Sequence, residues 1–179
     1  DEVRGYFDAK GIWDINDKWR AGVDAELSSD DQFMRQYNIS SEDVLENDLY
    51  VERFSGRNYM TGRLSHFQDI RVSSRQTDQP DVLPEIYSSF IGDPNALLGG
   101  RWKAEFSALG LQREGNGQDV NRATAELGWE KRYVTGFGLV NTLDTMLRGD
   151  VYNVQDRDIA TSGSGRSRNS NQPRAFARA

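Results

Sequence analysis

The sequence predicts an all-β protein: a segment of an antiparallel, up-and-down transmembrane β-barrel, with about nine strands of a larger outer-membrane barrel. Three observations favour this class: a two-residue alternation of apolar and charged side chains, alternating runs of about 10 to 16 residues, and polar faces dense in paired charges. Strands of globular proteins cluster near about 5 or 6 residues, whereas a tilted strand that crosses a bilayer needs about 9 to 11. Charge pairs suit the hydrated interior of a wide barrel.

The clearest alternation opens the chain. From Gly5 to Ile15, glycine and apolar residues occupy the odd positions, and mostly charged residues occupy the even ones. After a turn at 16–18 the pattern resumes from Trp19 to Leu27. Two alternating runs joined by an Asn-Asp turn are typical of a β-hairpin.

The same arrangement recurs later in the chain. Alternating runs at about 98–108 and 122–130 lie on either side of a glycine-rich segment, 114–119, and predict a second hairpin. Residues 135–138 turn the chain again, into a strand that runs from about 139 to 154.

The middle and the end of the chain alternate less cleanly. We expect four further strands, at about 33–40, 45–54, 58–71 and 82–91, and no helix. The last stretch is rich in Ser, Gly, Arg and Asn without a period, which predicts a disordered polar tail. The expected organisation is a partial barrel over 1–155 and a tail over 156–179. Because bacterial barrels usually have an even number of strands, nine strands indicate a segment of a longer chain.

The alternation also assigns a direction to the side chains of each strand. We expect the charged set to face the lumen of the barrel: Arg4, Lys10, Arg20, Asp24, Glu26, Arg101, Lys103 and Glu105. We expect the apolar set to face lipid: Phe7, Trp13, Val23, Trp102, Phe106 and Leu127.

Composition argues against several other functions. The net charge of −6 disfavours nucleic acid as a partner, because binding phosphates needs an excess of clustered Lys and Arg. The chain has no cysteine and a single histidine, His66, so neither thiolate nor multi-histidine metal sites are available. We therefore expect no catalytic site, no cofactor and no metal. Turnover of a lipid ester that is lost on replacing His66 would favour an enzyme instead.

Two rival classes share the two-residue period. Soluble β-sandwiches and lipocalin-like binding modules also alternate, and a compact, detergent-free monomer would favour them. A porin or another outer-membrane transporter is a further alternative.

Short segments of the sequence resemble, in order, the barrel of the LptD family. The matches cover about residues 3–155 and comprise Arg4–Asp8, Asp14–Gly22, Ser29–Asp31, Arg35–Tyr37, Tyr50–Tyr59, His66–Gln68, Val82–Pro84, Gly99–Trp102 and Leu147–Tyr152. After about Asp158 the sequence stops resembling barrel strands.

The resemblance implies a function in the bacterial outer membrane. It implies a large barrel that inserts lipopolysaccharide (LPS) into the outer leaflet, is plugged by an LptE-like lipoprotein, and receives LPS through periplasmic bridge proteins and a β-jellyroll domain. Outer-membrane lipid surrounds such a barrel, and no cofactor is implied. No residue of the family's exit gate can be placed in this segment. Since the chain lacks cysteine, no disulfide of the family is carried over either.

Overall fold

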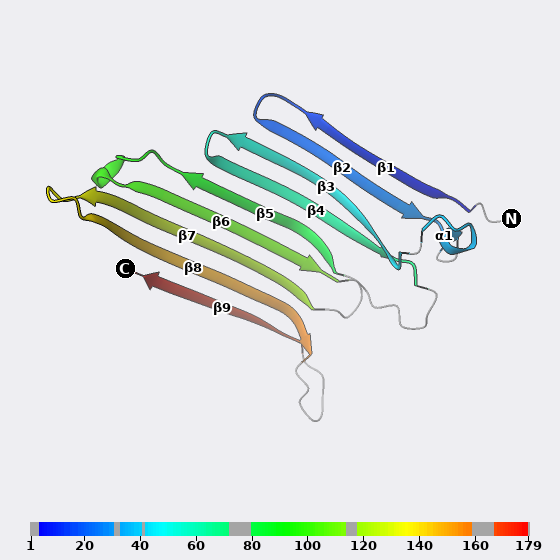
Figure 1. Cartoon of the computed structure of the whole chain (residues 1–179). Helices are drawn as coiled ribbons and strands as arrows, with labels where there is room; N and C mark the ends of the chain where they lie inside the picture. Colours follow the sequence, from blue (N-terminus) through cyan, green and yellow to red (C-terminus); the bar gives the residue numbers. More distant parts are fainter. Residues whose placement is uncertain are drawn as a thin grey trace.

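The protein forms a single antiparallel sheet in a computed structural model, which describes residues 4–30, 33–40, 42–71, 80–113, 118–158 and 167–178. Nine strands follow one another in chain order, and each pairs with the next (Figure 1). Their bounds are β1 Tyr6–Asp14, β2 Trp19–Ser28, β3 Val44–Ser55, β4 Asn58–Asp69, β5 Asp81–Ile91, β6 Arg101–Gln112, β7 Asp119–Val134, β8 Val140–Asp158 and β9 Ser167–Arg178. The all-β, up-and-down prediction is confirmed. The sheet is open, because the ladders among the described residues do not join β1 to β9.

The prediction of a strand at 33–40 is wrong. Phe33–Gln36 forms a short helix, α1, in the connection between β2 and β3. Backbone hydrogen bonds fold this connection on itself: the Tyr37 amide donates to the Phe33 carbonyl at 3.2 Å, and the Ile39 amide donates to the Met34 carbonyl at 2.9 Å. Phe33 and Met34 are adjacent apolar residues, so the sequence here lacks the two-residue alternation of a strand. A second short element, the 3₁₀ turn η1, covers Leu97–Gly99 before β6.

The prediction of a disordered tail also needs correction. β8 continues to Asp158, and Ser167–Arg178 forms β9, which pairs with β8 from Met146↔Arg178 to Asp158↔Ser167. Residues 159–166 of the expected tail lie outside the described residues. The edge of β8 offers backbone partners whatever the side chains are, so a strand rich in Ser, Asn and Arg can form without a clean alternation. The number of strands is the expected nine, but α1 replaces one expected strand and β9 is an additional one.

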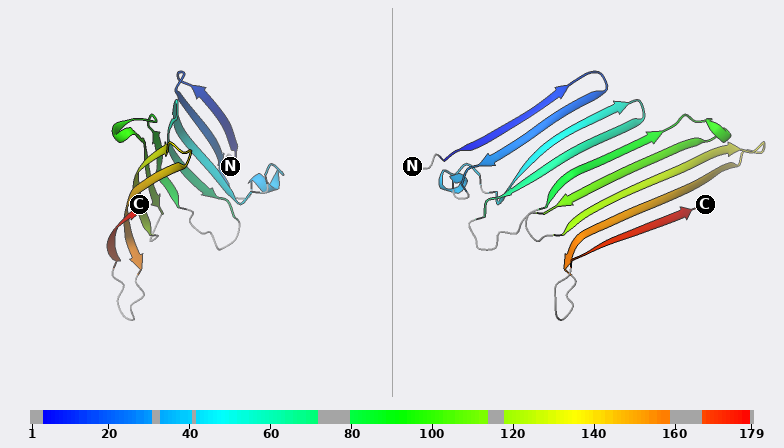
Figure 2. Two further views of the ribbon diagram at one scale, coloured as in Figure 1. Left: turned by 60° about the vertical axis from the view of Figure 1, so that its left-hand side comes forward. Right: turned by 180° about the vertical axis from the view of Figure 1, so that it is seen from behind.

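The sheet is one twisted layer (Figure 2), and few of its described side chains are buried. The fully buried apolar side chains of the described part form a small cluster of Met34, Leu45 and Ile70, with Phe33 and Tyr6 packed against it. This cluster caps the end of the sheet where α1 lies. A soluble sandwich needs a second layer to bury one face of each sheet, and the described residues do not supply one.

The two ends of the sheet differ in their connections. At one end the strands are joined by two to nine residues, at 15–18, 56–57, 92–100 and 135–139. At the other end, which carries α1, the connections have six to fifteen residues, at 29–43, 70–80, 113–118 and 159–166. We call these the short-turn end and the α1 end.

One glycine is required by a close approach between strands. The ladder between β5 and β6 shifts register between Val82 and Glu85, and a Cβ at Gly110 would lie 2.3 Å from the Leu83 carbonyl oxygen. Real Cβ atoms essentially never come this close to another atom, so Gly110 permits the irregular pairing.

We predict that Gly110→Ala destabilises the folded protein by about 1 to 3 kcal/mol, because either the backbone of β5 or that of β6 must shift. The check is the urea concentration at half-unfolding of the protein in detergent. Gly128→Ala is the matched control, since a Cβ there meets no heavy atom closer than 3.7 Å. Equal midpoints for the two variants would contradict the steric argument.

Candidate functional site: the two faces of the sheet

Register determines which side chains share a face, because residues directly opposite in an antiparallel pair point to the same side. One unbroken series of partners runs Gly11↔Val23↔Leu49↔Leu64 across β1 to β4, and another runs Ile86↔Ala108↔Ala123↔Val151 across β5 to β8. The pair Gly62↔Ile86 joins the two series. These residues therefore lie on one face, which we call the apolar face.

The apolar face is exposed from β1 to β8. Phe106 is 43% exposed and Leu147 is 57% exposed, although both belong to central strands. Other large, exposed apolar residues that the register places here are Phe7, Trp13, Leu27, Leu49, Leu64, Phe90, Leu127, Leu143 and Val151. Large exposed apolar surfaces mark sites of contact with a membrane or with another protein.

Tryptophan is restricted to the apolar face. All four tryptophans of the sequence lie on it, as the pairs Trp13↔Ala21, Trp19↔Arg53 and Trp102↔Trp129 show. Trp13, Trp19 and Trp102 each lie within one residue of the short-turn end of their strand. Arg53 is an exception to the apolar character of this face, and its guanidinium stacks over the Trp19 ring at 5.8 Å.

The opposite face, which we call the polar face, carries ion pairs between neighbouring strands. On β1 and β2, Lys10 bonds to Asp24, and Arg20 donates to Asp14 at 2.8 Å. On β6 and β7, Lys103 donates to Glu130 at 2.6 Å. Further ion pairs between strands on this face are Arg63–Asp48, Arg122–Asp150 and Arg148–Glu126. Arg148 also pairs with Asp150 within β8, and the Tyr59 hydroxyl donates a hydrogen bond to Glu52. Partly exposed pairs of this kind add little stability in water, but they cover the face with charge.

The structure separates the two predicted sets of residues. All six of the predicted lipid-facing residues lie on the apolar face: Phe7, Trp13, Val23, Trp102, Phe106 and Leu127. Seven of the predicted lumen-facing residues lie on the polar face: Lys10, Arg20, Asp24, Glu26, Arg101, Lys103 and Glu105. The eighth, Arg4, precedes β1 and forms an ion pair with Asp30 at 3.2 Å. Which medium each face meets stays a prediction.

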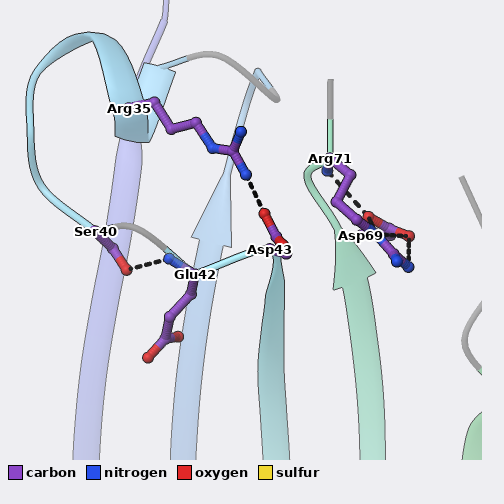
Figure 3. Close-up of polar contacts among 6 residues, drawn as sticks. All are labelled: Arg35, Ser40, Glu42, Asp43, Asp69 and Arg71. Atoms are coloured by element: carbon purple, nitrogen blue, oxygen red, sulfur yellow. Dashed lines mark hydrogen bonds and ion pairs between the residues drawn. The ribbon is translucent and has the colours of Figure 1, made fainter. Parts of the chain in front are cut away.

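The α1 end carries a polar cluster of its own (Figure 3). Arg35 of α1 forms an ion pair with Asp43, just before β3, and the Glu42 amide donates to the Ser40 hydroxyl at 3.1 Å. Next to them, both the amide and the guanidinium of Arg71 donate to the carboxylate of Asp69. The hydrogen bond to Asp69 raises the pKa of the Arg71 guanidinium above its ordinary value. The first two contacts lie within the β2–β3 connection, and the third lies at the end of β4; the Ile70 amide joins the two by donating to the Asp43 carbonyl at 3.0 Å.

Three polar residues that the sequence analysis did not group interrupt the apolar face near this end. Asn47 pairs with His66 in the ladder between β3 and β4, and Gln68 pairs with Leu45. His66 Nδ1 lies 2.8 Å from Asp81 Oδ1. In the sequence, each of these polar residues interrupts the apolar alternation of its strand. That they lie close together becomes apparent only from the register of β3 and β4.

Among the described residues, no group of three or more His, Asp or Glu side chains could hold a metal ion. In the same residues, no helix is long and apolar enough to span a membrane.

Comparison with known proteins identifies a family to which this chain is similar. The family model LptD, described as LPS transport system D, matches residues 2–179, which is nearly the whole chain. No curated protein matches the chain. The match includes the residues of β9, where the sequence resemblance had stopped. The chain belongs to the LptD family, whose members act in LPS transport.

Proposed function

We propose that this chain is part of the wall of an outer-membrane β-barrel that inserts LPS into the outer leaflet. The family accounts for LPS as the transported molecule. The observation that carries the specific role is the separation of exposed apolar and charged side chains onto opposite faces of one continuous sheet. A barrel wall with lipid outside and water inside needs this separation in every strand.

LPS itself explains why such a wall is useful. Its sugars are strongly polar and its acyl chains are apolar, so a single solvent suits only one part of the molecule. The polar face, with pairs such as Lys10–Asp24 and Lys103–Glu130, offers a hydrated surface to the sugars. Acyl chains can pass into lipid only where the wall parts between strands, because elsewhere the backbone ladder is closed.

The partners are proposed from the family resemblance. An LptE-like lipoprotein plug inside the barrel would contact the polar face. Periplasmic LPS-bridge proteins would deliver LPS to the periplasmic rim of the barrel. Both are proposed from the family resemblance, and outer-membrane lipid is proposed as the neighbour of the apolar face.

The difference between the two ends supports an orientation. Outer-membrane barrels have short periplasmic turns and longer extracellular loops. The short-turn end, with its connections of two to nine residues, would then face the periplasm. Trp13, Trp19 and Trp102 would then lie where the periplasmic side of the outer membrane meets water, a position at which tryptophan is enriched. The α1 end would face the cell exterior.

We predict that Val23→Arg impairs barrel assembly much more than Asp24→Arg. Val23 lies on the apolar face and its neighbour Asp24 on the polar face, so the pair is matched in position. An arginine on the lipid side near the bilayer midplane costs about 2 to 4 kcal/mol. The measurement is the fraction of heat-modifiable, folded protein in outer-membrane preparations. Equal tolerance of the two substitutions would contradict the proposed facing.

We further predict opposite labelling of single cysteines at the two ends, in a chain that has no cysteine of its own. Tyr37 at the α1 end and Phe137 at the short-turn end are both exposed aromatic residues. A membrane-impermeant maleimide should label Tyr37→Cys in intact cells, but Phe137→Cys only after the outer membrane is permeabilised. The reverse pattern would overturn the orientation, and labelling of both in intact cells would contradict a wall between two compartments.

A further inference from the structure

The connection between β5 and β6, residues 92–100, presents two adjacent leucines at the short-turn end. With nine residues it is the longest connection of that end, and it carries η1 (Figure 1). The Leu97 side chain is 75% exposed and the Leu98 side chain is 68% exposed. A single exposed leucine is ordinary in proteins, but two adjacent ones on a connection that is held in place indicate a contact surface.

Side chains of the apolar face hold this connection. Trp102 Nε1 donates to the Leu97 carbonyl at 3.1 Å, and Lys131 Nζ donates to the Leu98 carbonyl at 3.2 Å. The register of β6 and β7 places both donors on the apolar face. The backbone of η1 therefore lies toward the apolar face, and its two leucines continue that face beyond the ends of the strands.

Further contacts fix the two ends of the connection. Near its start, Arg57 of the β3–β4 turn donates to the Asp93 carboxylate at 2.7 Å. At its end, a Cβ on Gly100 would lie 2.4 Å from Trp129 Nε1, so the backbone there packs directly on the indole ring. The connection is thus tied to β4, β6 and β7 and is part of the fold of the sheet.

Leu98 has a backbone conformation that leucine rarely adopts. Its φ is 67°, in the left-handed region where a side chain is disfavoured. Such a conformation persists only where the surrounding structure holds it, and residues of this kind cluster at functional sites. Here the bond from Lys131 holds the carbonyl of the same residue. The fold therefore keeps the two leucines presented at the expense of local strain.

The charges on the apolar face differ between its two ends. Arg53 and Lys131 occupy apolar-face positions near the short-turn end of their strands. Toward the α1 end, the register places the carboxylates of Asp81 and Asp119 on this face. Lys and Arg at a membrane surface attract lipid phosphates. Cationic groups beside exposed apolar side chains at the short-turn end therefore match a layer of phospholipid headgroups.

We propose that Leu97 and Leu98 insert into the phospholipid leaflet on the periplasmic side of the outer membrane. The proposal rests on the proposed function, since it requires the apolar face to meet lipid and the short-turn end to face the periplasm. Interfacial elements bury their apolar side chains about 5 to 10 Å into the boundary between headgroups and acyl chains. The β5–β6 connection would then be a fixed anchor, held at the level of Trp102, that sets how deep this end of the wall lies.

The test measures the depth of a fluorophore at Leu98 in a lipid bilayer. Because the chain has no cysteine, Leu98→Cys can carry a single environment-sensitive fluorophore. The full chain is reconstituted into phosphatidylcholine vesicles that contain no other protein and that carry nitroxide-labelled phosphatidylcholine as a quencher. We expect a blue-shifted emission and at least about twofold quenching by a nitroxide near the top of the acyl chain, as for a side chain at the interface. A nitroxide near the end of the acyl chain should quench less.

Three further variants serve as controls. Asp17→Cys lies in the 15–18 connection at the same end and is exposed, so a fluorophore there should show the emission typical of water. Adding Leu97→Asp to Leu98→Cys should lower the quenching to the level of Asp17→Cys, because a carboxylate resists entry into hydrocarbon. Leu97→Met, which keeps an apolar side chain, should leave the quenching unchanged.

Other results would overturn the proposal. They are emission typical of water at Leu98→Cys, which would favour a protein partner for this surface, equal quenching at Asp17→Cys, or no effect of Leu97→Asp. Leu127→Cys, in the middle of β7 on the apolar face, distinguishes failure of the anchor from failure of the proposed function. If a nitroxide near the end of the acyl chain quenches Leu127→Cys while Leu98→Cys stays in water, the anchor fails and the barrel wall stands. If Leu127→Cys also stays in water, the barrel function itself fails.

Discussion

Backbone pairing between neighbouring strands is the constraint on which this structure depends. Each antiparallel ladder places opposite residues on one side, so a slip of a single residue would exchange the faces of a strand. Seven consecutive ladders join β1 to β8, and outside the register shifts in β4–β5 and β5–β6 they keep the same parity, so Phe7 of β1 and Leu147 of β8 lie on one face. The small cluster of Met34, Leu45 and Ile70 is confined to one end, so hydrogen bonds rather than a central core hold most of the sheet.

The same ladders fit the sheet to a membrane. In hydrocarbon every backbone N–H and C=O group needs a partner within the protein, and strands can supply one only if both of their edges are paired. The inner strands are paired on both sides along most of their length, with the exception of the α1 end of β2 and β3, whereas β1 and β9 each present an edge that the described ladders leave open. Open edges of this kind can pair with further strands.

The sequence predicted the parts of this fold that local patterning determines. Strands β1, β2, β6 and β7 have clean alternation, and the parity of Lys10 or Trp102 could be read directly from it. Alternation could not reveal α1, where Phe33 and Met34 are neighbours and the fold is decided by the burial of Met34 against Leu45 and Ile70. Nor could it reveal β9, whose pairing depends on the edge of β8. The contact between Gln68 and Ser28 spans forty residues, so no local signal predicts it.

At the junction of β2 and β3, the first residues of β3 can either pack against α1 or pair with the end of β2. The fifteen-residue connection places α1 at the end of the sheet, and Met34 is buried there against Leu45, the second residue of β3. A strand end engaged with this cap cannot at the same time pair with the end of β2, so the ladder stops at Asp24↔Asp48. Asn47 and Gln68 then supply the missing hydrogen bonds. An apolar pair at these two positions would leave the Glu26 and Ser28 amides unsatisfied, which costs about 1 to 3 kcal/mol for each buried group. Polar residues at this point of the apolar face are therefore required by the backbone.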